Sequence, residues 1–205
     1  MARSTPTRST DAPRDAIALL KGDHRAVEQL FEEFEEADDE QLGAIAQRVC
    51  QMLTVHAQIE EEILYPQAME AFEEEEETEL VHEAEVEHAS AKDLIAKIEG
   101  MTIEDESFKA TVKVLSEYIK HHVKEEETEM FPKLKKTELD LKDLGAQLAT
   151  RKMELMEQMG IEEEAEPAAP RKRAISRAKT STRAKARSGA RRSASRSSNS
   201  RSARH

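Results

Sequence analysis

The chain has 205 residues, of which 36% are charged and 3% aromatic, and its formal net charge is −12. This length allows one domain with appendages and is short for two full domains. The scarcity of aromatic residues argues against a β-sandwich or β-barrel, whereas the abundance of Glu, Lys, Ala and Leu favours helices. The single cysteine, Cys50, excludes a disulfide framework and a zinc site made of several thiolates.

Helical periodicity begins near the N-terminus. Residues 1–12 are expected to be flexible, and a first helix is predicted to follow the capping residue Asp11 and to run through Phe34. The turn at residues 37–39 separates it from a second helix, which Pro66 is expected to kink or close.

Two more helices of similar length complete the pattern. A third is predicted from the acidic run 73–77, interpreted as a solvated helix start, to Ile98, with Gly100 after its end. A fourth is predicted from residues 102–105 toward Pro132. Four helices with short connections predict an all-α protein, an antiparallel up-down four-helix bundle over residues 13–136.

The C-terminal part differs in composition from the rest. Residues 137–160 predict an additional helix, Leu139 to Met159, that ends at Gly160 and packs across the bundle. Residues 161–205 read as a linker and a disordered basic tail rich in Arg, Ser and Ala, because they contain too few apolar residues to form a core.

The net charge conceals a division between the two parts. Of 31 Lys and Arg residues, 13 lie in residues 171–205, which contain none of the 43 acids, so this tail carries +13 and residues 1–170 carry −25. The tail predicts non-specific binding to nucleic acid; the alternative is that it docks on the acidic body. No stretch of about 18 apolar residues occurs, so we predict no membrane span and a cytoplasmic location.

An internal repeat is the most informative feature. The segment from His56 to Pro66 aligns without gaps to His122 to Pro132, at an offset of 66, and both read His-x-x-x-Glu-Glu-x-x-(Leu/Met)-aromatic-Pro. At an offset of 64, Asp23-His24 aligns with Glu87-His88. The body therefore reads as a helical hairpin used twice.

The spacing within the repeat suits metal binding. Residues i and i+4 of a helix point from one face, so His56 with Glu60, and His122 with Glu126, can hold an ion between them. Their neighbours are apolar, and unpaired polar groups inside a bundle would be costly. The candidate metal ligands are His24, His56, Glu60, His88, His122 and Glu126.

This ligand set indicates two metal ions, one from each half, with carboxylates able to bridge them. Imidazole and carboxylate together suit iron or, less well, manganese. The alternative is a hydrogen-bonded network without metal. Three histidines are left out: His82 has no repeat partner, His121 points about 100° away from His122, and His205 lies in the tail. Tyr65 and Phe131 are interpreted as packing residues.

These residues resemble the hemerythrin-like, or HHE cation-binding, domain over roughly residues 14–135. The phrases that carry the resemblance are LLKGDHRAVEQLFEEF, HAQIEEEILYP, EHASAKDLIAKI and HHVKEEETEMFP. The resemblance implies a four-helix bundle around a non-haem di-iron centre, in a family whose members bind dioxygen, sense oxygen, iron or nitric oxide, or handle peroxide.

One position departs from the oxygen-carrying pattern. Those proteins place a second histidine one turn before the third-helix ligand, and this chain has Ala84 there. Water, Glu85 or Glu61 is expected to replace the missing ligand.

The function predicted from the sequence is di-iron binding with O2, another diatomic or peroxide as partner, more a binding or sensing protein than an enzyme. The alternatives are a nucleoid-associated DNA-binding protein that uses its tail, and a di-iron peroxidase or oxidase.

Overall fold

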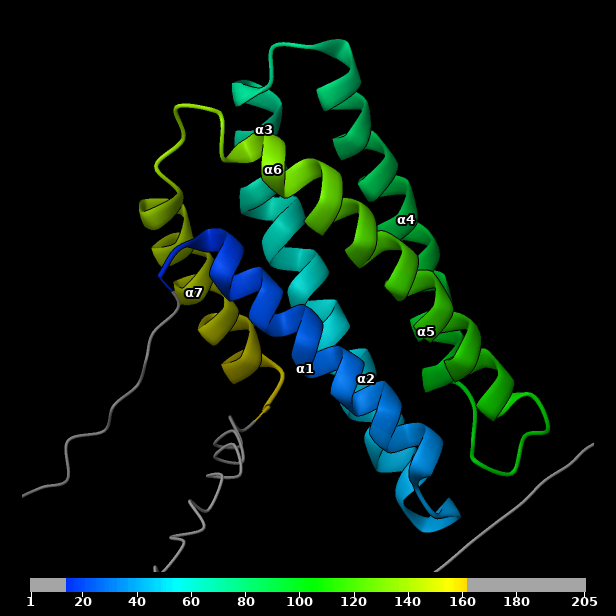
Figure 1. Ribbon diagram of the computed structural model, residues 1–205. Helices are drawn as coiled ribbons and strands as arrows, with labels where there is room; N and C mark the ends of the chain where they lie inside the picture. The colour runs from blue at the N-terminus through cyan, green and yellow to red at the C-terminus, as the bar shows by residue number, and fades with distance from the viewer. Residues whose placement is uncertain (1–13, 162–205) are drawn as a thin grey trace, which may run out of the picture. The chain divides into compact units, whose positions relative to one another are not determined.

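A computed structural model describes residues 14–161, and all its regular elements are helical (Figure 1). The prediction of an all-α protein is confirmed for this range. The predicted N-terminal segment 1–12 and the tail from residue 162 onward lie outside the described residues. None of the helices within 14–161 combines the length and the apolar character needed to cross a membrane. In chain order the elements are α1 (Ala16–Glu36), α2 (Asp39–Ile59), η1 (Glu60–Leu64), α3 (Tyr65–Ala71), α4 (Glu75–Glu99), α5 (Phe108–Glu125), η2 (Glu126–Met130), α6 (Phe131–Leu134) and α7 (Leu141–Gln158).

The first helix begins later than its sequence predicts. Asp15, and not Asp11, is the N-cap, because its side chain accepts a hydrogen bond of 2.8 Å from the Ala18 N–H. The helix therefore starts at Ala16. At the other end of the domain, Gly160 adopts a φ of 65°, as expected of a glycine that ends a helix, whereas Gly100 has a φ of −83° and does not use this freedom.

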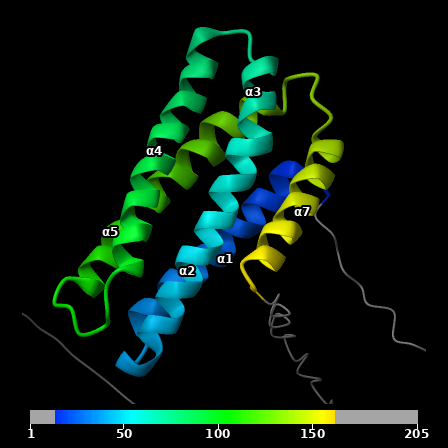
Figure 2. The ribbon, with the colours of Figure 1, turned by 180° about the vertical axis from the view of Figure 1, so that it is seen from behind.

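The helices form two hairpins. Helix α1 packs along α2, and α4 packs along α5, while α2 also contacts α4 and α1 contacts α5. Figure 1 shows α4 and α5 side by side, and Figure 2 shows the same pairing from behind. This arrangement brings the two copies of the sequence repeat face to face.

Of the two outcomes predicted for Pro66, a kink or an end of the helix, the end is wrong, because helical turns continue past both prolines of the repeat. A π-helical turn precedes each proline: η1 leads into α3, and η2 leads into α6. In each turn the N–H before the proline bonds five residues back, from Tyr65 to the Glu60 carbonyl and from Phe131 to the Glu126 carbonyl. The wider π turn accommodates a proline ring that a regular α-helix would exclude.

The core consists of two apolar clusters with a polar layer between them. One cluster contains Ala16, Ile17, Leu19 and Leu20 of α1, together with side chains of α3 and α7. The other contains Val27 to Phe34 of α1 and the opposite end of the bundle. The residues between these stretches of α1 include Asp23 and His24, which are buried but polar. The same interruption occurs on α2, α4 and α5, so each helix contributes to one polar layer.

Helix α7 packs on the first hairpin, as predicted, and contacts α1 and α2 (Figures 1 and 2). The approach is close at Gly145, where an added Cβ would lie 2.6 Å from the Ala16 nitrogen. Only glycine fits this crossing without a shift of the backbone.

Candidate metal centre

The six residues predicted to bind metal all lie in the polar layer. Each is buried, and Glu60 and Glu126 are the most deeply buried, at 0% and 1% exposure. The i,i+4 spacing places His56 with Glu60 and His122 with Glu126 on the inner faces of their helices.

The first group of ligand-type atoms joins the two halves of the repeat. His24 Nε2 lies 3.2 Å from His56 Nε2 and 3.2 Å from Glu126 Oε2. His56 Nε2 also lies 3.2 Å from Glu60 Oε2. These four residues have the spacing of a metal-binding set.

The second group shares Glu60 with the first. His88 Nε2 lies 3.1 Å from His122 Nε2 and 3.5 Å from Glu60 Oε2. This set has three residues, one fewer than the first. Glu60 therefore stands between the two groups.

Each of the four histidines also has a carboxylate on its outer nitrogen, Nδ1. Two of these carboxylates precede a histidine of the repeat: Glu87 accepts a bond of 2.7 Å from His122, whereas Asp23 lies 3.6 Å from His56 Nδ1, too far for a hydrogen bond, and leaves both atoms without a partner. The other two follow a repeat glutamate: Glu61 faces His88 at 3.0 Å and Glu127 faces His24 at 3.0 Å. A carboxylate that accepts the Nδ1–H fixes the ring and leaves the Nε2 lone pair directed inward.

Each outer carboxylate is paired in turn with a basic side chain. Lys21 bonds to Glu127 at 2.6 Å, Lys92 bonds to Glu61 at 2.5 Å, and Lys152 of α7 bonds to Asp23. The partner of Glu87 is His121, at 3.2 Å. Of these carboxylates the sequence pointed only to Glu61, and as a replacement ligand rather than as a partner of an outer nitrogen, although both Asp23-His24 and Glu60-Glu61 recur in the repeat.

The interior of the cluster contains acceptors with few donors. Both carboxylate oxygens of Glu60 and Oε2 of Glu126 are buried without a hydrogen-bond partner. The inward Nε2 atoms of the four histidines supply lone pairs when their Nδ1–H groups bond outward. A cation or additional protons would satisfy this arrangement, because unpartnered buried acceptors are costly.

The pKa shifts reflect the same shortage of donors. Burial raises the pKa of Glu60 well above the ordinary value, and the charge of Glu126 raises it further. Burial, helped by the charge of His122, lowers the pKa of His88 to about 3. For Glu126 burial acts upward, but His122 and His24 outweigh it and lower the pKa. Without a metal the two carboxyls thus differ in protonation.

Tyr65 belongs to the site, although the sequence was interpreted as giving it a packing role. Its hydroxyl donates a hydrogen bond of 3.1 Å to Glu126 Oε1 and lies 3.2 Å from His88 Nε2. Burial, followed by the charges of Glu126 and Glu60, raises the pKa of the phenol, so it stays protonated. Phe131, its counterpart in the repeat, stacks on His24 with the rings 5.9 Å apart.

The surroundings of Ala84 also differ from expectation. Ala84 is buried beside Tyr65 in one apolar cluster. Of the two acids expected to substitute for a missing ligand, Glu85 lies on the exposed face with His82, and Glu61 contacts the outer nitrogen of His88. On the inner side, His88 Nε2 faces His122, the Tyr65 hydroxyl and Glu60.

A small, mostly apolar cavity of about 20 Å³ adjoins the cluster. All four histidines line it, together with apolar side chains such as Val27, Leu53 and Ile119. The volume is enough for a water-sized molecule.

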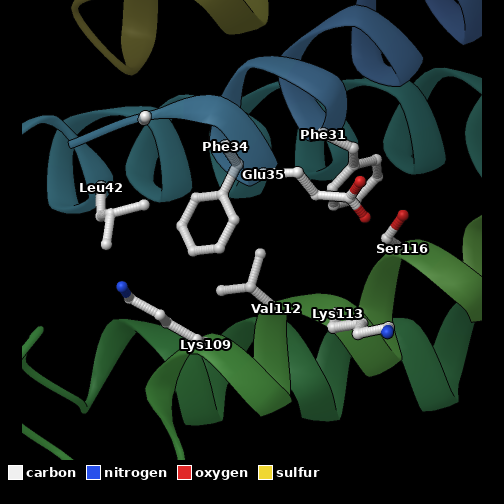
Figure 3. A pocket seen from close by; sticks show the side chains of 9 residues that line it. Phe31, Phe34, Glu35, Leu42, Lys109, Val112, Lys113 and Ser116 are labelled. Atoms are coloured by element: carbon white, nitrogen blue, oxygen red, sulfur yellow. The ribbon is translucent and has the colours of Figure 1, made fainter. Parts of the chain in front are cut away.

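A larger cavity, of about 310 Å³, lies between α1, the start of α2 and α5, and none of the cluster histidines lines it. Figure 3 shows Phe34 and Leu42 facing Val112 across this space, with Lys109 and Lys113 on the α5 side. It is therefore separate from the candidate metal centre.

Comparisons with known proteins agree with the geometry. Residues 15–134 match the family described as the hemerythrin HHE cation binding domain. A solved structure of a protein with this domain, from Mycobacterium kansasii, superposes with a TM-score of 0.60 at 23% identity, covering 70% of this chain and 88% of that one. A protein of Nostoc sp. described as a DNA nickase is 30% identical over 114 residues, which are 55% of this chain and 31% of the relative. The chain thus spans under a third of that relative.

Proposed function

This chain belongs to the hemerythrin HHE cation-binding domain family, and we propose that it holds two non-haem iron ions in the buried His/Glu cluster and binds or senses O2 or a related small molecule there. The proposed ligands are His24, His56, Glu60, His88, His122 and Glu126. We further propose that α1, α2, α4 and α5 act as an antiparallel four-helix bundle over residues 13–136, with 137–160 as an added helix.

The observation that carries this proposal is the acceptor-rich interior. Glu60 has both oxygens buried without a donor, and the outer carboxylates draw the histidine N–H groups away from the centre. A metal ion would neutralise such a cluster, whereas a hydrogen-bonded network would need an added proton on Glu60 or on an inward imidazole.

The division of the atoms supports two ions. One set contains four residues and the other three, and Glu60 belongs to both, as a bridging carboxylate would. Imidazole and carboxylate without thiolate favour iron or manganese, and bundles of this architecture commonly hold di-iron sites.

The chain's own residues would orient the ions and shelter them from water. Glu87, Glu61 and Glu127 hold the rings of His122, His88 and His24 from outside, and Asp23 lies 3.6 Å from the outer nitrogen of His56. Bound iron would supply reversible electron transfer with O2 or peroxide. The apolar cavity of about 20 Å³ leaves room for a diatomic molecule and little else.

The test is metal analysis and absorption spectroscopy of the purified full chain. We expect about two iron ions per chain and a visible charge-transfer band that appears on exposure of the reduced protein to air. A reversible band supports O2 binding, and loss of the band with release of iron supports sensing or storage. Metal content well below one ion per chain would overturn the proposal.

A paired variant separates the site from general damage. His56→Ala with Glu60→Gln should abolish iron binding, because it removes one ligand of the first set and the shared carboxylate. The matched control is His82→Ala with Glu85→Gln, an exposed His–Glu pair at 3.4 Å, which should retain full iron content.

A specific observation favours a second candidate, a di-iron peroxidase or oxidase. Such chemistry needs a proton donor beside the site, and the buried Tyr65 hydroxyl, 3.1 Å from Glu126 and 3.2 Å from His88, provides one. Tyr65→Phe should then retain iron but lose peroxide turnover, by about 100-fold or more if the hydroxyl is the general acid. Equal turnover in the two proteins would rule out this role.

The basic tail keeps its predicted role as a proposal. Residues 171–205 carry +13, which suits binding to phosphates without sequence specificity. The relative described as a DNA nickase matches over a part of its length only, so its activity does not transfer to this chain. We also retain the proposal of a cytoplasmic location.

A further inference from the structure

A second group of metal-binding side chains lies on the surface beside the buried cluster. It consists of Glu87 on α4 and of His121 and Glu125, four residues apart on α5. His121 Nδ1 lies 3.2 Å from Glu87 Oε1, and His121 Nε2 lies 3.5 Å from Glu125 Oε1. One ligand-type atom from each residue falls within 4.8 Å of the others.

Glu87 connects this group to the buried cluster. Its Oε2 accepts the bond from His122 Nδ1 at 2.7 Å, while its Oε1 faces His121. One carboxylate thus serves an inner ring with one oxygen and the surface group with the other. An ion held at Oε1 would leave the His122 bond intact.

The partner of Glu87 distinguishes it from the other three outer carboxylates. Those three are paired with Lys21, Lys92 and Lys152. An ammonium group carries only donors and cannot bind a cation, whereas a neutral imidazole offers a lone pair. Of the four outer positions, the one at Glu87 therefore has a metal-binding group as its partner.

The sequence repeat shows that the fold does not require this group. The residues that precede His121 and Glu125 by 66 positions are Val55 and Ile59, which are buried in the apolar cluster that includes α7. On α5 the equivalent face is open to solvent, and the His121 side chain is 63% exposed. The spacing His-x-x-x-Glu appears here a second time, one residue before His122 and Glu126.

The surroundings of this surface group are negatively charged. Glu83 and Glu129, together with Glu87, act on Glu125 through their negative charges. Such a concentration of acids raises the local concentration of divalent cations. One imidazole with two carboxylates suits a first-row transition metal better than Ca²⁺ or Mg²⁺, which prefer oxygen ligands alone.

We infer that Glu87, His121 and Glu125 form an outer site for an exchangeable divalent transition-metal ion, linked to the buried cluster through Glu87. The inference goes beyond the proposed function and rests on it only in treating His122 as a ligand of the inner centre. An ion in the outer site withdraws charge from Glu87, so it changes how strongly that carboxylate holds the His122 N–H.

The experiment counts zinc on the full chain by equilibrium dialysis at fixed free Zn²⁺. Zn²⁺ accepts imidazole and carboxylate ligands and is diamagnetic, so the histidine ring signals can be followed by NMR. Three proteins are compared: wild type, His121→Ala with Glu125→Gln, and His82→Ala with Glu85→Gln. Glu87 stays in place because it also holds His122. The substituted residues are on the surface, and thermal unfolding checks that the fold is retained.

We expect the outer-site variant to bind one ion fewer than wild type, and the His82/Glu85 variant to match wild type. In wild type, the signal of His121 should shift as this ion binds, while that of His82 stays unchanged. Equal zinc content in wild type and the outer-site variant, or a His121 signal that does not move, would overturn the inference. The iron content of the same proteins reports on the inner centre separately: its absence would overturn the proposed inner centre and leave the outer site standing.

Discussion

Replacing Glu60 by glutamine should stabilise the metal-free protein and abolish metal binding. Glu60 is fully buried, and both of its carboxylate oxygens lack a donor. Glutamine has nearly the same shape but carries an NH₂ group, which can donate to Glu126 or to the Nε2 atom of His56, 3.2 Å from Glu60 Oε2. The substitution therefore supplies donors where a metal ion otherwise would.

The magnitude follows from the cost of an unpartnered buried polar group, about 1–3 kcal/mol. We expect Glu60→Gln to raise the free energy of unfolding of the metal-free chain by about 1–3 kcal/mol at pH 7, and to raise the Tm by about 2–4 °C for each kcal/mol. In the presence of iron the order should reverse, because only wild type gains stability from the bound ions.

The gain should depend on pH in a defined direction. The folded state raises the pKa of Glu60 above the ordinary 4.5 that it has when unfolded. The folded wild type therefore binds more protons than the unfolded chain above about pH 4.5, and this lowers its stability as the pH rises. Below that value both states are protonated, so the advantage of Glu60→Gln should shrink as the pH falls from 7 toward 4.

The assay is urea unfolding of the chelator-treated full chain at several pH values. The matched control is Glu62→Gln in the same π turn; Glu62 is on the surface and pairs with Arg151, so its loss should change stability by at most about 1 kcal/mol. A Glu60→Gln protein less stable than metal-free wild type at pH 7, or a gain that does not vary with pH, would refute the reasoning.

Four further predictions concern α7, α1 and the tail. Gly145→Ala should destabilise the protein by about 1–3 kcal/mol, because the new Cβ would collide with the backbone at Ala16. Gly22→Ala in α1, with open space around it, should stabilise the protein by up to about 1 kcal/mol. Thermal unfolding measures both, and changes in Tm of the same sign would contradict this reasoning. Lys152→Met should weaken iron binding by about 10-fold in chelator competition, because it removes the ammonium group that bonds to Asp23 near His56. An unchanged affinity for iron would show that α7 does not influence the centre. A chain ending at residue 166 should lose DNA retention at low salt, and retention equal to that of the full chain would disprove the role of the tail.

The repeat in the sequence was enough to predict both the fold class and the positions of the six buried His and Glu residues. Each hairpin carries a His-x-x-x-Glu unit of the repeat on its second helix. The neighbouring positions on the same face are apolar, so this face, with its His and Glu, must point toward the interior of the bundle. The period of the helix thus carries information about which side chains meet.

The sequence could not predict where the helices begin or how they pass Pro66. Asp11 was predicted as the cap of the first helix, whereas Asp15 caps it, at the point where Gly145 of α7 lies against the start of α1. The π turns η1 and η2 depend on hydrogen bonds five residues apart, which no local propensity encodes.

Tyr65 was missed for a related reason. An aromatic residue five positions after Glu60 is equally consistent with packing at the end of a bundle, and the contact that matters is with His88 and Glu126, distant in sequence. Only the three-dimensional arrangement shows that its hydroxyl faces the cluster while its ring packs.

Two differences between the halves of the repeat explain why the centre is unequal. Leu20 and Ala84 occupy equivalent positions one turn before their histidines, and Phe131 and Tyr65 are equivalent aromatic residues. On the His24 side the larger Leu20 accompanies a phenylalanine that stacks on the ring. On the His88 side the smaller Ala84 accompanies a tyrosine whose hydroxyl reaches the cluster. The Tyr65 hydroxyl donates to Glu126 of the four-residue set and lies beside His88 of the three-residue set, so we expect a small molecule bound at the proposed centre to meet this proton donor near His88.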